Sequence, residues 1–131
     1  MTAPARVPGC RVQLFARTPL DPVRWRLLSS NNREIGRGVE AYADAEACRL
    51  AVKELQADLD AAETVVRRAD ANAWMWQLTV DGRPVAASAH GYDRQIRCRR
   101  GSVQFRLELR DALIIAEVMT SHARRWGGSV A

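Results

Sequence analysis

The chain repeats its own pattern once, at an offset of about fifty residues. A segment that begins at Val23 can be placed over one that begins at Trp74, and the match continues after a one-residue gap near Ser30. The aligned pairs are Trp25 with Trp76, Leu27 with Leu78, Ile35 with Val85, Tyr42 with Tyr92, Cys48 with Cys98, Leu55 with Phe105 and Leu59 with Leu109. Self-similarity at a fixed spacing is the signature of a repeated structural unit. We therefore predict a tandem duplication whose two halves share one core.

Each half has the pattern of three strands followed by a helix. Residues 24–29 alternate, with Trp25 and Leu27 on one face, as a half-buried strand requires. Asn31-Asn32 and Asp81-Gly82 predict hairpin turns, because these residues tolerate positive φ. A further strand precedes each hairpin, at 12–15 and at 64–67, and a short return strand follows it. A closing strand is expected at 113–116.

A helix is expected after each return strand. Asp44 is a candidate N-cap for the first helix. The buried stripe of that helix is predicted to be Cys48, Ala51, Val52, Leu55 and Leu59. Residues 102–109 of the second half carry two signals: their strict alternation is typical of a strand, whereas the repeat predicts a helix. We favour the helix, because the matched segment of the first half is clearly helical.

These elements predict one α+β domain with both helices packed on a single mixed or antiparallel sheet. We divide the chain into a disordered N-terminal tail (1–9), a first β3-α repeat (10–62), a second β3-α repeat with the closing strand (63–119) and a flexible basic tail (120–131). A chain of 131 residues can bury enough surface to fold without disulfides or a metal.

The repeated motif resembles the YegP-like family, small bacterial and archaeal domains of unknown function. The family pattern is an aromatic strand, an Asn/Asp-Gly type turn, a Tyr and then a helix. The matching residues are Trp25-Arg26-Leu27, Asn31-Asn32, Ile35, Tyr42 and Val52 in the first copy, and Trp76-Gln77-Leu78, Asp81-Gly82, Val85, Ser88, Tyr92 and Gly101 in the second. The resemblance implies two β3-α units in one sheet, with their C-terminal strands exchanged between the units. It implies no agreed activity and no catalytic residues.

The chain is basic, with 20 Lys and Arg against 15 Asp and Glu and a formal charge of +5. Such a charge favours anionic partners. Lys53 is the one lysine among the basic residues, however, and arginine-rich composition also follows from GC-rich coding. Both explanations of the arginine excess remain open.

Cysteine usage and the N-terminus indicate a soluble cytoplasmic protein. The three cysteines are widely spaced, which fits a reducing compartment better than a disulfide framework. The first nine residues lack the apolar run of a signal peptide, and the longest apolar stretch, 112–119, is too short to cross a membrane. We therefore predict no membrane association.

The sequence offers little that predicts catalysis. Cys98 and His90 could form a nucleophile pair, but Cys98 repeats Cys48 on the core stripe. The two histidines and three cysteines are too scattered for a metal site. Gly36-Arg37-Gly38 lacks the context of a phosphate-binding loop. We predict no enzyme activity, no cofactor, no metal and no small-molecule substrate.

The second helix gives the best candidate for a binding surface. With about 100° per residue, Ile96, Val103 and Leu107 fall opposite the core face. The residues beside this stripe are Arg99, Arg106 and Arg110. An apolar stripe flanked by arginines is typical of a protein interface, and it would also suit phosphate groups. If residues 102–109 formed a strand, these side chains would not share one face and the surface would not exist.

We therefore predict a non-catalytic binding module that contacts a protein partner, or a second copy of itself, through the second helix. The alternative is a nucleic-acid-binding protein that uses the same arginines. In that alternative the tail residues Arg124, Arg125 and Trp126 would add charge and a stacking ring.

Overall fold

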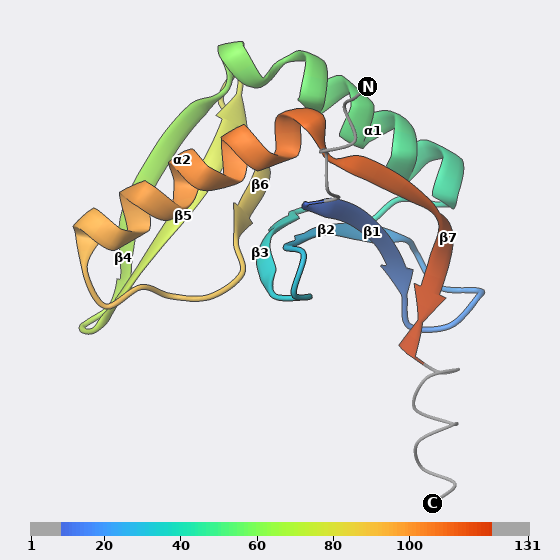
Figure 1. Cartoon of the computed structure of the whole chain (residues 1–131), viewed down its shortest axis with the longest axis horizontal. Helices are drawn as coiled ribbons and strands as arrows, with labels where there is room; N and C mark the ends of the chain where they lie inside the picture. Colours follow the sequence, from blue (N-terminus) through green and yellow to red (C-terminus); the bar gives the residue numbers. More distant parts are fainter. Residues whose placement is uncertain (1–8, 122–131) are drawn as a thin grey trace, which may run out of the picture.

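The computed structural model describes residues 9–121 as seven strands, two α-helices and a 3₁₀ turn (Figure 1). In chain order these are β1 (Arg11–Ala16), β2 (Arg24–Leu28), β3 (Glu34–Gly38), α1 (Ala45–Ala57), the turn η2 (Leu59–Ala61), β4 (Glu63–Asp70), β5 (Ala73–Val80), β6 (Arg83–Ser88), α2 (Gln95–Asp111) and β7 (Leu113–Thr120). Residues 102–109 lie inside α2, so the helix interpretation of this segment is confirmed. Most of the two predicted tails lies outside the described residues.

The strands form one sheet in the order β4-β5-β6-β3-β2-β1-β7. All neighbours are antiparallel except β1 and β7, which run parallel. The mixed α+β fold expected from the sequence is therefore confirmed. The halves of the sheet join where β3 pairs with β6, with Arg37 opposite Ala87. The helices cover the sheet together: α1 contacts β1 and β2, whereas α2 contacts β3, β4 and β5 (Figure 1).

Each helix is followed by a strand at one edge of the sheet. β4 follows α1 and pairs with β5, while β7 follows α2 and pairs with β1, with Val12 opposite Ile114. The last strand of the described chain thus lies beside the first. That this arrangement arose by duplication and strand exchange stays a prediction.

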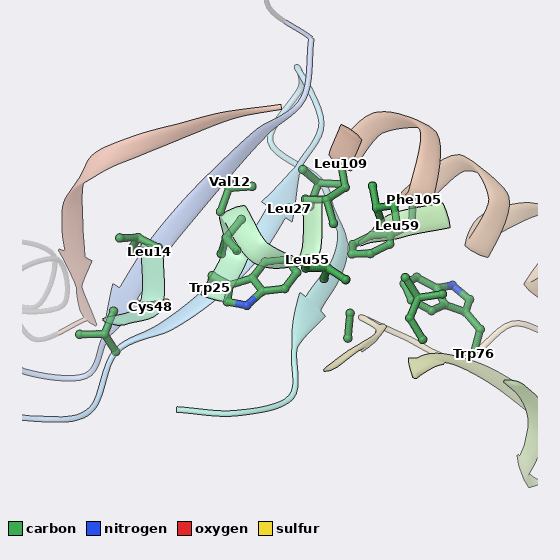
Figure 2. Packing of buried hydrophobic residues seen from close by; sticks show 14 of the residues in the cluster. Val12, Leu14, Trp25, Leu27, Cys48, Leu55, Leu59, Trp76, Phe105 and Leu109 are labelled. Carbon is green, nitrogen blue, oxygen red and sulfur yellow. The ribbon is translucent and has the colours of Figure 1, made fainter. Parts of the chain in front are cut away.

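One continuous core holds the two helices on the sheet. The indoles of Trp25 and Trp76 are almost fully buried, and Phe105 of α2 contacts both (Figure 2). The Phe105 ring centroid lies 6.3 Å from that of Trp25 and 4.7 Å from that of Trp76. The two tryptophans that the repeat alignment pairs are therefore core residues, and a single phenylalanine lies between them. Burying aromatic rings of this size contributes much of the stability of a small core.

The hairpin turns and one helix cap form as predicted. Asn32 and Asp81 adopt positive φ angles of 68° and 53° in the β2–β3 and β5–β6 turns. Asp44 caps α1, because its side chain accepts a 2.8 Å hydrogen bond from the backbone N–H of Ala47. Arg94 stands at the N-cap of α2 and makes no side-chain capping bond. The second helix therefore starts without the side-chain acceptor that serves the first.

Candidate interaction surface on the second helix

The helix α2 has a buried face and an exposed face. Cys98, Ser102, Phe105 and Leu109 are buried against the sheet. Within the helix, the Ser102 hydroxyl donates a 2.8 Å hydrogen bond to the Arg99 carbonyl, so this buried polar group is satisfied. The spacing of these four residues is the three-to-four-residue period of a helix that packs on one side. The opposite side of the helix is therefore free to carry other side chains.

The exposed side carries the predicted apolar stripe. Ile96, Val103 and Leu107 expose 54%, 55% and 63% of their surface. A soluble helix usually places charged or small residues at such positions, as α1 does with Glu46, Lys53 and Ala57 at the matched places. Three large apolar side chains in one line are therefore a feature of α2 that packing within residues 9–121 does not explain.

The three predicted flanking arginines do not share one environment. Arg99 is exposed and has no side-chain hydrogen bond or ion pair within residues 9–121. Arg110 is also exposed and pairs with Asp60 at 3.0 Å. Such an exposed ion pair is weak and can rearrange when a partner binds. Arg99 and Arg110 thus lie beside the stripe as expected.

Arg106 corrects the prediction, because it is partly buried and bound to the backbone. Its guanidinium donates hydrogen bonds of 2.8 Å to the Leu59 carbonyl and 2.9 Å to the Ala62 carbonyl. Leu59 is the first residue of the 3₁₀ turn that follows α1, and Ala62 is the C-cap of that turn. Arg106 therefore ties the end of the first half to α2, and we assign it a structural role.

The remaining residues that the sequence singled out lie in three places: Cys98 in the core, His90 on the surface, and the others in the undescribed tail. Cys98 is fully buried, so its thiol is inaccessible. Burial also raises the pKa of this thiol, which favours the protonated, unreactive form. The His90 ring packs on Tyr92, with 4.7 Å between the ring centroids. Arg124, Arg125 and Trp126 lie outside the described residues. Within residues 9–121, no cluster of metal-ligating side chains occurs, and neither helix is long and apolar enough to cross a membrane.

A feature that the sequence interpretation missed is a cleft between α2 and the β2–β3 hairpin. This open groove has a volume of about 560 Å³ and is lined by Arg33 of the hairpin, by Arg97 and Arg100 of α2, and by Tyr92 of the connection before α2, among others. Tyr92 lies directly on the helix, because a Cβ on Gly101 would stand 2.7 Å from Cζ of its ring. We name this groove the α2 cleft.

A second cleft occupies the matched place in the other half. It lies between α1 and the β5–β6 hairpin and is lined by Glu40, Tyr42, Glu54, Asp58 and Arg83, among others. We name it the α1 cleft. Each cleft therefore combines the helix of one half with the hairpin of the other. The repeat alignment of Arg33 with Arg83 and of Tyr42 with Tyr92 was the signal in the sequence, but it does not by itself bring a hairpin next to the opposite helix.

The architecture defines a small α+β protein with the YegP-like fold that the sequence resemblance implied. Two solved structures share it: a UPF0339 protein from Shewanella oneidensis, with a TM-score of 0.67 at 14% identity, and YegP from E. coli, with a TM-score of 0.63 at 14% identity. The matches cover 86% and 87% of this chain, and 93% and 96% of the respective structures. YegP is itself described as a protein of unknown function. No protein-family model matches the sequence, and neither does any curated protein.

Proposed function

We propose that this chain is a non-catalytic binding module and that the exposed face of α2 docks an acidic, amphipathic segment of a protein partner. The observation that carries the proposal is the line of Ile96, Val103 and Leu107, each more than half exposed. Burying such side chains at an interface stabilises a complex by roughly 25 cal/mol per Å² of apolar surface, before the costs of association are subtracted. A contiguous apolar stripe on a helix is a common docking site for another helix.

The charges beside the stripe favour an acidic partner over a second copy of this chain. Arg99 and Arg110 border the stripe on one side, and Arg100 borders it on the other. In a twofold dimer through this face, arginines of the two copies would approach each other, which is unfavourable. Carboxylates of a partner would instead pair with these exposed guanidinium groups.

We further propose that the two β3-α repeats arose by duplication. After the duplication, the repeats kept the same core residues, and the outer faces of their helices diverged. The difference between Leu107 in α2 and Ala57 at the matched place in α1 supports this reading. We expect the protein to act in the cytoplasm, where its cysteines stay reduced.

The test is binding of a designed helical peptide that presents leucines on one face and glutamates on the others. The variant Leu107→Glu should weaken this binding by about tenfold or more, since it places a charge in the apolar contact and repels the peptide. The matched control is Ala57→Glu, which makes the same change of charge at the equivalent position of α1 and should leave the affinity unchanged. Equal effects of the two variants, or no binding of the peptide, would contradict the proposal.

The second candidate, nucleic-acid binding, rests on the exposed Arg99 and Arg110 together with the undescribed tail arginines. It predicts an affinity for single-stranded DNA or RNA that falls steeply with salt. Arg99→Ala with Arg110→Ala should then weaken binding and reduce its dependence on salt, whereas the uncharged change Leu107→Ser should not affect it. Because the acidic peptide would also contact these arginines, the substitution that separates the two functions is Leu107→Ser, which should weaken binding of the peptide and leave binding of the nucleic acid unchanged.

A further inference from the structure

The two matched clefts have opposite charge. The α1 cleft has three carboxylates in its lining, from Glu40, Glu54 and Asp58, against the single guanidinium of Arg83. The α2 cleft has three guanidinium groups, from Arg33, Arg97 and Arg100, against the single carboxylate of Glu34. Two clefts built on the same plan thus present opposite fields to solvent.

The change of charge lies on the helix side of the clefts. The hairpin arginine is the same in both, because Arg33 and Arg83 occupy matched positions. On the other side, His90 stands in place of Glu40 and Gln104 in place of Glu54. In α2 the cleft also gains Arg97 and Arg100, where α1 has Ala47 and Leu50. At each of these four positions the residue of the second half is therefore less acidic or more basic than the matched residue of the first half.

The positive charge of the α2 cleft is not neutralised within the described part of the chain. Arg33 and Arg100 make no side-chain hydrogen bond or ion pair with residues 9–121, and Arg97 reaches Asp93 only at 4.0 Å between exposed groups. The carboxylate of Glu34 is occupied by Arg37 at 2.6 Å and by Arg26 at 3.4 Å. Since guanidinium groups that share one groove repel each other, they are stabilised by an anion between them.

We propose that the α2 cleft binds a small phosphorylated molecule, with Arg33, Arg97 and Arg100 around its phosphate groups. A phosphate monoester offers about two negative charges and three acceptor oxygens, which suits several guanidinium donors at once. A lone carboxylate has one charge and two oxygens, and it would leave part of the arginine charge without a counterion. The groove volume of about 560 Å³ is in the range of small-molecule sites. The Ser30 and Asn31 side chains in the lining add neutral polar groups for the rest of the ligand.

This site adjoins the proposed docking face of α2 and shares Arg100 with it. Arg97 lies about 100° around the helix from the apolar stripe, on the side that meets the β2–β3 hairpin. Leu107 does not line the cleft. Arg33→Gln therefore changes the cleft alone, and Leu107→Ser changes the docking face alone.

The experiment is a titration of the full chain with inorganic pyrophosphate at low salt, followed by the NMR signals of the arginine Nε–H groups. We expect saturable shifts of the Arg33, Arg97 and Arg100 signals. The variant Arg33→Gln should weaken pyrophosphate binding by about tenfold, as should the pair Arg97→Gln with Arg100→Gln, because each removes charge-assisted hydrogen bonds. The matched control Arg83→Gln removes the same residue type from the acidic α1 cleft and should leave the affinity within about twofold.

Three results would overturn the proposal. The first is the absence of saturable shifts. The second is equal weakening by Arg33→Gln and Arg83→Gln, which would mean that pyrophosphate senses only the net charge. The third is a single-stranded oligonucleotide that binds the same arginines far more tightly than pyrophosphate and cannot be displaced by it, since the ligand would then be nucleic acid. Retention of pyrophosphate binding in the Leu107→Ser variant would show that the cleft does not depend on the apolar stripe of α2. All three arginines are exposed, so their substitution should leave the fold intact.

Discussion

Gly36 of β3 lies directly against the ring of Phe105 in α2, so closely that a Cβ on Gly36 would stand 2.6 Å from Cδ1 of that ring. This contact joins a strand of the first half to the helix of the second. It explains why a residue without a side chain occupies the middle of a buried strand, where glycine is otherwise unfavourable.

The close approach predicts that Gly36→Ala destabilises the protein by about 1–3 kcal/mol, the usual range for overpacking a core. Urea denaturation would measure the loss. In a Phe105→Leu background the same change should cost less, because the smaller side chain removes the closest contact, although the Trp76 ring still lies 2.8 Å from the Cβ position. An equal cost in both backgrounds would contradict the contact as the cause.

The two helix starts predict opposite effects of two substitutions. Asp44→Ala should destabilise the protein by about 1 kcal/mol, because it removes the cap of α1. Arg94→Asp should stabilise it by a similar amount, since it supplies an acceptor and a favourable charge at the start of α2. Both are measurable as shifts of the urea midpoint. A loss with Asp44→Ala but no gain with Arg94→Asp would show that the start of α2 cannot accept this cap.

The contacts of Arg106 predict that it matters for stability rather than for binding. Arg106→Gln should cost about 1.5–3 kcal/mol, because it removes two charge-assisted hydrogen bonds to the Leu59 and Ala62 carbonyls. Arg99→Gln, on an exposed site of the same helix, should change stability by no more than about 0.5 kcal/mol. Equal effects in denaturation would contradict the structural role of Arg106.

The thiols predict a loss of stability in alkali. Burial raises the pKa of Cys48 from 9.0 to about 11, while burial and then the neighbouring Glu108 raise that of Cys10 to about 11. A group whose pKa is higher in the folded than in the unfolded state stabilises the native state fully at pH values below its pKa in the unfolded state. Stability from these two thiols is therefore complete below pH 9 and is lost as the pH rises toward 11. The urea midpoint should fall over this window, and Cys48→Ala should reduce the fall.

The sequence predicted the order of elements well, because the repeat supplied a second reading of every segment. The local alternation of Val103, Phe105 and Leu107 is typical of a strand, yet these residues form a helix. The alternation arose because two of the three side chains are apolar but exposed. A pattern method assumes that apolar residues are buried, and it fails where the surface itself is apolar.

The candidate site was harder to predict where it depends on contacts between distant residues. Ile96, Val103 and Leu107 lie on one helix, so helical geometry alone placed them together. The partners of Arg106 are backbone carbonyls of another element. Because every residue has a backbone carbonyl, the sequence does not indicate which ones an arginine will contact. The α2 cleft joins Arg33 to Arg97 across the line where the two halves meet. Only the pairing of strands β3 and β6 brings such groups together.

The parallel pairing of β1 with β7 has a consequence for synthesis on the ribosome. Val12 is among the first described residues to emerge, but its partner Ile114 follows about a hundred residues later. During most of translation β1 therefore has a neighbour on one side only. The first half can form its hairpin and its helix early, while its sheet stays open along one edge until β7 has emerged from the ribosome. Completion of the sheet thus waits for the synthesis of β7, and in that interval the exposed edge of β1 is open to unwanted strand pairing.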